Sequence, residues 1–333
     1  MKIKRGIMIV VKILVVVLAL TALYRGFIAW QYNSAKKNAE VIEAGWKFDP
    51  DLKYNLDGGQ PLFLVKPGNK VTMIFMEGFR TQNPAGMYMD WLSELHNKYG
   101  VNIFVPVYGI QSSPFQLRYR KWFPEEDIRT VLQAYEAYTV MLPKDHRVVT
   151  VSQSFGTYPH AGILARAARK PDAAIFLSPL NTSMEYRAAG EFVFWLSKQM
   201  NWIQYVISFT KPAPSPSRVS VWDIVNPEKN KKMADRFPIN PEDNSHHGVQ
   251  VQETAQLMES TLYPQIKGKN ILVVNGDSDL YFAQKGFINT TAILEKCGNT
   301  VEHIVLKNSG HMVLVDNGED QLKAKIISVL KNK

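Results

Sequence analysis

Residues 146–156 read HRVVTVSQSFG, and this stretch decides the fold. Its first six letters predict a buried strand, and the residues that follow it predict a helix. Between the two elements stand residues 152–156 (SQSFG), in which small residues, Ser152 and Gly156, flank Ser154 two positions away on either side. A sharp strand-to-helix turn needs small residues there because the neighbouring backbone comes close, and such a turn lifts the hydroxyl of Ser154 clear of the sheet.

Strands and helices alternate along the chain on both sides of this turn. The pattern predicts strands at residues 61–65, 70–76, 102–108, 146–151, 173–177, 270–275 and 301–306, and helices at residues 87–98, 124–142, 155–169, 282–297 and 319–330. Apolar strands that alternate with helices are typical of a parallel sheet covered on both faces, and right-handed crossovers make such a sheet doubly wound. The predicted fold class is therefore α/β, with a doubly wound, mostly parallel sheet. The alternation stops at residues 181–267, which we interpret as an insertion rather than a second domain.

Composition excludes several classes of protein. The chain has 333 residues, 46% of them hydrophobic and 21% charged, so it is neither disordered nor collagen-like. The single cysteine, Cys297, excludes an intramolecular disulfide and any metal site built from several thiolates. We expect this thiol, at the end of a helix, to be inert.

The net charge of +9 comes mostly from the N-terminus, because seven cations precede the first acidic residue, Glu40. The rest of the chain carries 32 cations against 30 anions, and a nucleic-acid site would need a basic stripe on the folded body. Nucleic acid is therefore not an expected partner. These cations are Lys2, Lys4, Arg5, Lys12, Arg25, Lys36 and Lys37.

The same N-terminal segment carries an apolar run. Residues 13–23 are apolar apart from Thr21, which is the length of a signal-peptide core. Extension to Trp30 gives about 18 residues, enough for a short membrane span if Arg25 snorkels. The positive-inside rule keeps the basic end in the cytoplasm and puts the body outside. We expect residues 1–37 to be an uncleaved signal anchor with its linker, an N-terminal hydrophobic helix; the alternatives are a cleaved, exported chain and a buried core helix.

A serine hydroxyl is a poor nucleophile and needs a base and a group that orients the base. Candidates for both follow later strands. The strand at 270–275 runs into Gly276-Asp277-Ser278-Asp279, and the strand at 301–306 is followed by Gly310-His311-Met312. The order serine, carboxylate, histidine along the chain is that of the α/β-hydrolase fold.

From about Val71 to the C-terminus the chain resembles the α/β-hydrolases, and within them the lysophospholipase and monoacylglycerol-lipase branch. The acid motif of that family falls on Gly276 and Asp279, and its Gly-His-Met ending falls on residues 310–312. The resemblance implies that Ser154 is the nucleophile, Asp279 the orienting acid and His311 the base, with no metal or organic cofactor. It places the oxyanion hole at the backbone amides of Phe79 and Phe155.

The chain departs from the family pattern at two positions. Ser152 stands where the nucleophile motif has its first glycine, a small change that the turn should tolerate. The family usually has His-Gly after the strand at 70–76, whereas this chain has Glu77-Gly78-Phe79-Arg80. A carboxylate is unusual beside a site that stabilises negative charge, so Glu77 either pairs with Arg80 or faces away.

Other candidates compete for these roles. Asp277 is an alternative acid, although Asn-Gly-Asp-Ser is also turn chemistry. His303 lies within a predicted strand and is better explained by packing or solvent exposure than as a base. His246 and His247 stand in a polar stretch without the spacing of metal ligands, which favours a solvated loop.

The resemblance makes the insertion at 181–267 a cap over the active site, within an α/β domain of residues 38–333. Residues 191–209 (EFVFWLSKQMNWIQYVISF) are too apolar for a fully exposed helix, so they either bind an acyl chain or pack on the body. Arg118, Arg120 and Lys121 either hold an anionic headgroup or form a solvated basic turn. The expected function is hydrolysis of carboxylic esters, with a lipid or lysolipid as substrate; the alternatives are a thioesterase, a peptidase and a non-catalytic binding protein.

Overall fold

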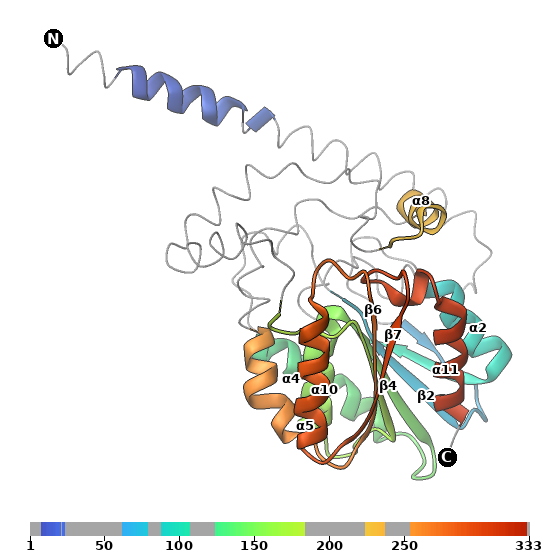
Figure 1. The fold of residues 1–333 in the computed structure, drawn as a ribbon. Coiled ribbons are helices and arrows are strands. Elements are labelled where there is room, and N and C mark those ends of the chain that lie inside the picture. The colour runs from blue at the N-terminus through green and yellow to red at the C-terminus, as the bar shows by residue number, and fades with distance from the viewer. Residues whose placement is uncertain are drawn as a thin grey trace.

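The computed structural model describes residues 8–20, 22–23, 62–78, 88–106, 124–183, 224–236 and 254–331. Within these ranges seven strands form a single sheet with helices on both of its faces (Figure 1). The strands run in the order β1-β3-β2-β4-β5-β6-β7. The predicted α/β class with a doubly wound, mostly parallel sheet is therefore confirmed.

Six of the seven strands, β2 to β7, run parallel to one another. Only β1 runs antiparallel, against β3, with Leu62 opposite Val105. All seven predicted strands are present within a few residues of their expected bounds. They are β1 Leu62–Leu64, β2 Val71–Met76, β3 Val101–Val105, β4 Arg147–Gln153, β5 Ala173–Leu177, β6 Asn270–Gly276 and β7 Thr300–Leu306.

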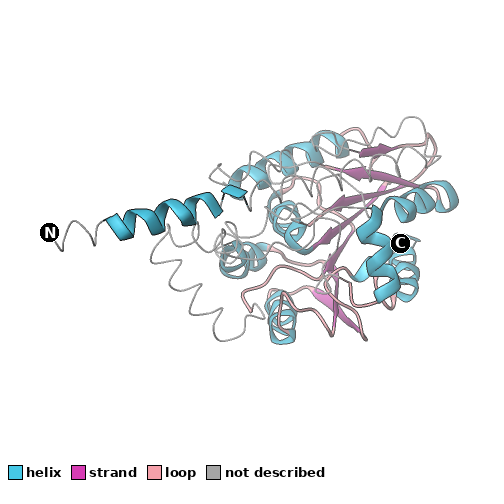
Figure 2. Ribbon diagram, turned by 90° about the horizontal axis from the view of Figure 1, so that it is seen from above, coloured by secondary structure: helices cyan, strands magenta, loops and turns pink. Residues whose placement is uncertain are grey.

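Helices cover both faces of the sheet, which is why most of the predicted strands are largely apolar; the edge strand β7, which contains Glu302 and His303, is an exception. The five predicted helices are present, together with α8 in the insertion. They are α2 Met89–Tyr99, α4 Pro124–Thr139, α5 Thr157–Arg166, α8 Pro227–Arg236, α10 Gln284–Lys296 and α11 Glu319–Lys331. Buried side chains of α2 and α11 share one core, and those of α4, α5 and α10 share the other (Figures 1 and 2).

Strand β5 illustrates the consequence of this layering. All five of its residues are buried. Ala173, Ile175 and Leu177 pack in the core under α2 and α11, whereas Ala174 and Phe176 pack in the core under α4, α5 and α10. Because successive side chains of a strand point to opposite faces, a sheet with two covered faces requires apolar residues at consecutive positions.

The last part of the predicted insertion packs into the body. Residues 254–265 are helical, and Met258, Leu262 and Tyr263 are fully buried in the same core as α5 and α10. No regular element was predicted here, because the segment passes from α-helix through a π-turn (Met258–Leu262) to a 3₁₀ turn (Tyr263–Gln265) and so has no sustained helical period. The predicted bounds of the cap and of the α/β domain stay predictions, and residues 191–209 lie outside the described residues.

The N-terminal apolar run is helical where it is described, at residues 8–20 and 22–23, and its side chains are exposed. None of the helices within the described ranges combines the length and the apolar character needed to cross a membrane.

Candidate active site

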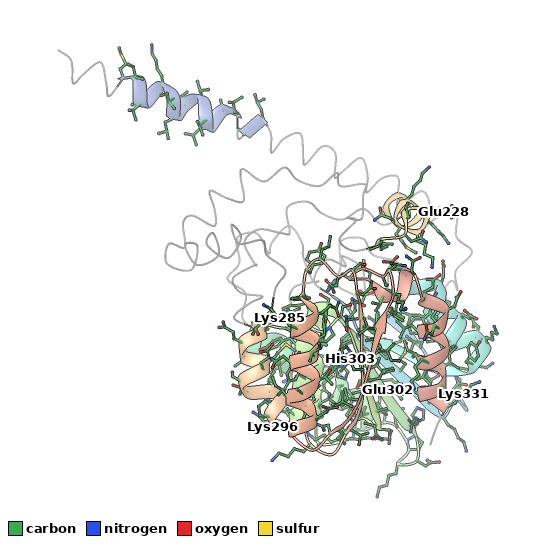
Figure 3. The ribbon with its side chains drawn as sticks, in the orientation of Figure 1. Glu228, Lys285, Lys296, Glu302, His303 and Lys331 are labelled. Atoms are coloured by element: carbon green, nitrogen blue, oxygen red, sulfur yellow. The ribbon has the colours of Figure 1, made fainter. Side chains whose placement is uncertain are left out.

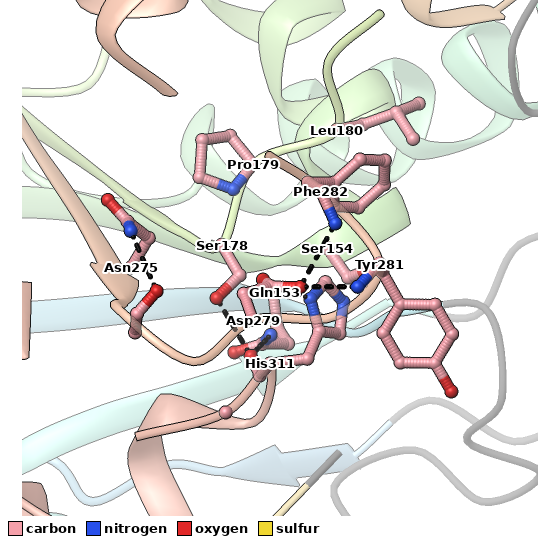
Figure 4. A network of polar contacts seen from close by, with 12 residues as sticks. Gln153, Ser154, Ser178, Pro179, Leu180, Asn275, Asp279, Tyr281, Phe282 and His311 are labelled. Atoms are coloured by element: carbon pink, nitrogen blue, oxygen red, sulfur yellow. Dashed lines mark hydrogen bonds and ion pairs between the residues drawn. The ribbon is translucent and has the colours of Figure 1, made fainter. Parts of the chain in front are cut away.

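The three predicted catalytic residues follow three strands at one edge of the sheet. Ser154 follows β4, Asp279 follows β6, and His311 follows β7. These strands are parallel, so their carboxyl ends meet at the edge where ligands bind in open α/β sheets. Figure 4 shows Ser154, Asp279 and His311 within one cluster of residues at these strand ends.

The turn that carries Ser154 is sharp and strained. Gln153 is still extended, whereas Ser154 has a φ of 52°, in the left-handed region that non-glycine residues rarely enter. Such a conformation costs on the order of 1–3 kcal/mol and persists only where the surroundings impose it. Here the Thr157 hydroxyl donates to the Ser154 carbonyl and accepts from the amide of Leu180 at 3.0 Å. The side chain of Ser154 is left partly exposed.

Gly156 shows why the second flanking position must be small. A Cβ at this position would lie 2.2 Å from the Met76 carbonyl oxygen and 2.6 Å from that of Glu77. The end of β2 therefore presses directly on the start of the helix that follows Ser154.

The first flanking position, Ser152, tolerates a side chain because that side chain points into a polar pocket of its own. Its hydroxyl lies 2.7 Å from Nδ1 of His160, and Nε2 of the same ring lies 2.6 Å from Oγ1 of Thr150. The Thr150 hydroxyl donates to the Ala173 carbonyl, so Nε2 carries the proton and Nδ1 accepts from Ser152. Burial lowers the pKa of His160 to about 3, which keeps the ring neutral.

The carboxylate of Asp279 is held at both oxygens. Oδ1 accepts from the amides of Tyr281 at 2.8 Å and Phe282 at 3.1 Å, and Oδ2 lies 2.7 Å from Nδ1 of His311. The alternative acid, Asp277, is exposed and accepts a hydrogen bond from Ser278. Of the two candidates, Asp279 is the one that contacts His311.

The imidazole of His311 is fixed by packing and by its backbone. The rings of Tyr281 and Phe282 lie 4.9 and 5.5 Å from it, centroid to centroid. Its carbonyl accepts hydrogen bonds from Nε2 of Gln153 and from the hydroxyl of Ser178, both at 2.8 Å (Figure 4). Nδ1 faces Asp279, so Nε2 is the ring nitrogen that this contact leaves unengaged.

Gln153 and Ser178 were not singled out from the sequence. Both are buried polar residues at the ends of apolar strands, β4 and β5. That contrast is a usable signal, because a polar side chain that ends a buried strand must find a partner nearby.

The predicted oxyanion hole is described in part. Phe155 is buried, and its amide directly follows Ser154 at the beginning of the helical segment. Phe79 and Arg80 lie outside the described residues. The preceding Gly78 adjoins Ser154, since a Cβ built on it would lie 3.2 Å from Cβ of Ser154. Glu77 is fully buried at the end of β2.

The remaining candidates lie elsewhere or outside the described ranges. His303 stands on the edge strand β7 (Figure 3), where Nε2 lies 2.7 Å from Oδ1 of Asn275 and burial lowers the pKa of the imidazole. Cys297 is a free thiol at the end of α10. No group of three potential metal ligands occurs among the residues that the structure describes. The candidates outside the described ranges are Arg118, Arg120, Lys121, His246 and His247.

Solved structures share this fold. A monoacylglycerol lipase from Paleococcus ferrophilus matches 84% of this chain and 98% of its own, at a TM-score of 0.58 and 15% identity. A carboxyl esterase from Bacillus coagulans matches 81% of this chain and 92% of its own, at a TM-score of 0.58 and 12% identity. A monoglyceride lipase from Saccharomyces cerevisiae matches 86% of this chain and 98% of its own, at a TM-score of 0.57 and 9% identity. These similarities confirm the α/β-hydrolase fold. No family model and no curated protein matches the sequence.

The contact between Gly156 and β2 predicts a large effect of one methyl group. We expect Gly156→Ala to lower the free energy of unfolding by about 3 kcal/mol or more, because the new Cβ meets backbone carbonyls that cannot move aside. Denaturant titration of the purified variant measures this. Gly298→Ala is the control: it has a φ of +83° but open space around it, so only the conformational cost of about 1–2 kcal/mol applies. Equal losses in the two variants would contradict the steric argument.

The buried His160 predicts a pH-dependent stability. Its folded-state pKa of about 3 lies below the 6.5 of an exposed histidine, so the unfolded chain binds the extra proton between these values. The stabilisation is complete above pH 6.5 and is lost as the pH falls toward 3, by up to about 1.4 kcal/mol per pH unit. We therefore expect the stability advantage of the wild type over His160→Gln to shrink between pH 7 and pH 5, measured by urea unfolding. A constant difference across this range would refute the prediction.

Proposed function

We propose that the protein is a serine hydrolase of carboxylic esters, with lipid or lysolipid acyl esters as its substrates. The observation that carries the proposal is the Asp279–His311 hydrogen bond at the strand ends where Ser154, in a left-handed conformation, is partly exposed after β4. The structural neighbours are named as lipases and an esterase, which supports the same class of substrate. The apolar sequence of residues 191–209 supports a substrate that contains an acyl chain.

In the acylation step each residue of the proposed site has its own role. Oγ of Ser154 attacks the acyl carbonyl carbon while Nε2 of His311 takes the hydroxyl proton. Asp279 keeps the ring in the tautomer with a proton on Nδ1 and stabilises the imidazolium that forms. The amides of Phe155 and Phe79 donate to the developing oxyanion. The bond to the alkoxy oxygen then breaks, and the imidazolium passes its proton to the leaving alcohol.

Deacylation repeats the sequence with water. His311 takes a proton from a water molecule, whose oxygen attacks the acyl carbon of the ester on Ser154. Collapse of the second tetrahedral intermediate breaks the bond to Oγ, returns the proton to Ser154 and releases the carboxylic acid. The groups on this chain complete the cycle without a redox step.

Labelling with a fluorophosphonate tests the proposal, because this reagent reacts with activated serines. We expect the wild type, kept in detergent, to gain one adduct on Ser154 by intact mass and peptide mapping, and Ser154→Ala to gain none. Asp279→Asn should slow both labelling and p-nitrophenyl ester hydrolysis by about 10³–10⁴-fold, because its one acceptor oxygen stays with the Tyr281 and Phe282 amides and its NH2 group then faces Nδ1, which favours the wrong tautomer of the imidazole.

The matched control is Asp277→Asn, two residues away and exposed, which should retain the wild-type rate. If the folded wild type stays unlabelled, the proposed hydrolase function is ruled out and a non-catalytic binding protein is favoured. A p-nitrophenyl ester series from acetate to palmitate then separates the substrates: rates that rise with chain length support a lipid ester, whereas a preference for acetate contradicts it.

For the N-terminal segment we infer a signal anchor that holds the catalytic domain outside the cytoplasm. The support is the exposure of its apolar side chains, among them Val15 at 59% and Leu18 at 60%, together with the basic residues that precede them. Exposed apolar side chains on a helix have a favourable environment in lipid.

Two lysines introduced into the N-terminal segment should abolish its association with membranes. We expect the wild type to sediment with membranes after carbonate extraction and the double variant Val15→Lys/Leu18→Lys to be released, because each lysine at the centre of the segment opposes insertion by about 3 kcal/mol. Leu280→Lys, on an exposed apolar residue of the body, is the control and should stay bound. Release of the wild type would exclude the anchor and leave a cleaved signal peptide.

A further inference from the structure

A buried carboxylate stands five residues after His311. Asp316 is fully buried, and both of its oxygens are occupied by backbone amides. Oδ2 accepts from Gly310 at 2.6 Å and from Val225 at 2.8 Å. Oδ1 accepts from Asn226 at 3.0 Å and from Asn317 at 2.8 Å. Four such bonds compensate for the cost of burying the carboxylate and give it one fixed position.

These four amides come from two distant parts of the chain. Gly310 immediately precedes His311, and Asn317 lies in the turn that follows Asp316. Val225 and Asn226 belong to the insertion, 91 and 90 residues earlier in the sequence. One carboxylate therefore ties the loop that carries His311 to the insertion.

Further polar contacts reinforce this junction. Asn226 accepts from the amides of Glu228 and Lys229, both at 3.1 Å, at the beginning of α8 (Figure 1). The side-chain nitrogen Nδ2 of Asn226 donates to Oδ1 of Asn317 at 2.9 Å. Lys229 donates to the Asp316 carbonyl at 2.9 Å and pairs with Glu319 at 2.8 Å.

The backbone around His311 is consequently held from two sides. On the sheet side, Gln153 and Ser178 donate to the His311 carbonyl. On the side of the insertion, Asp316 accepts from the amide of Gly310. Loss of either attachment frees the peptide groups that set the position of the imidazole. A displacement of about 1 Å can slow a reaction by about 100-fold.

We infer that Asp316 is a positioning residue, which sets the place of the His311 imidazole by joining its loop to the insertion. This inference rests on the proposed function, in which His311 is the general base. It assigns the insertion a part in building the active site, in addition to covering it.

The substitution Asp316→Asn tests this inference with little change in shape. An amide offers only one acceptor oxygen, so two of the four backbone amides lose their partner in either orientation of the side chain. The structural control is Asn299→Ala at the amino edge of the sheet. Asn299 is also buried and also makes three side-chain bonds to the backbone, with Lys269, Ile266 and Leu294, but it lies far from the strand ends that carry the site.

Two readouts follow the imidazole. The first is the rate of fluorophosphonate labelling of Ser154, which we expect to fall by about 10–100-fold in Asp316→Asn. The second is the downfield proton resonance of the His311 Nδ1–H, assigned by its loss in His311→Gln, which reports the bond to Asp279 whether or not the protein is an enzyme. We expect this resonance to shift or broaden in Asp316→Asn. In Asn299→Ala the unfolding midpoint should fall while the resonance and the labelling rate stay unchanged.

A second variant covers the case in which Asp316→Asn does not fold. Asn226→Ala weakens the same junction from the insertion and leaves Asp316 in place; it should change the resonance and the rate in the same direction by a smaller amount. Wild-type resonance and rate in the folded variants would overturn the inference, as would equal changes in Asn299→Ala. An unlabelled wild type whose resonance still responds to Asp316→Asn would refute the hydrolase and support the positioning role.

Discussion

The close approach of Gly156 to the end of β2 is the constraint on which the site depends. Because this position carries no Cβ, the helix after Ser154 begins against the carbonyl groups of Met76 and Glu77. The chain must therefore turn within one residue, and Ser154 takes the left-handed conformation that this turn imposes. Packing around the turn offsets the strain, and the side chain of Ser154 is left partly exposed at the carboxyl ends of the strands.

Buried polar contacts then fix the position of each loop around that hydroxyl. Ser152, His160 and Thr150 join β4 to α5 through a neutral ring, so that no buried charge is needed there. Gln153 and Asp316 hold the backbone on either side of the His311 loop. Such contacts are effective because an unpartnered polar group costs more inside a protein than at its surface.

Much of the fold could be predicted from the sequence, because both faces of the sheet are covered. Apolar runs such as 173–177 mark buried strands without ambiguity, and β5 has those same bounds. The segment at 254–265 could not be predicted, since it changes helix type within a few residues and its burial comes from contacts with α5 and α10. Asp316 was also missed, because the amides that surround it come from residues about 90 positions apart.

The sequence by itself determined the order of the elements, the turn at Ser154 and the presence of a carboxylate and a histidine after the right strands. These features follow from local patterns, in which periodicity and small residues are visible within a few positions. Only the tertiary structure shows that Asp277 is exposed whereas Asp279 meets His311 at 2.7 Å. The chemistry of the two side chains is identical, so only the surroundings that the fold brings together distinguish them.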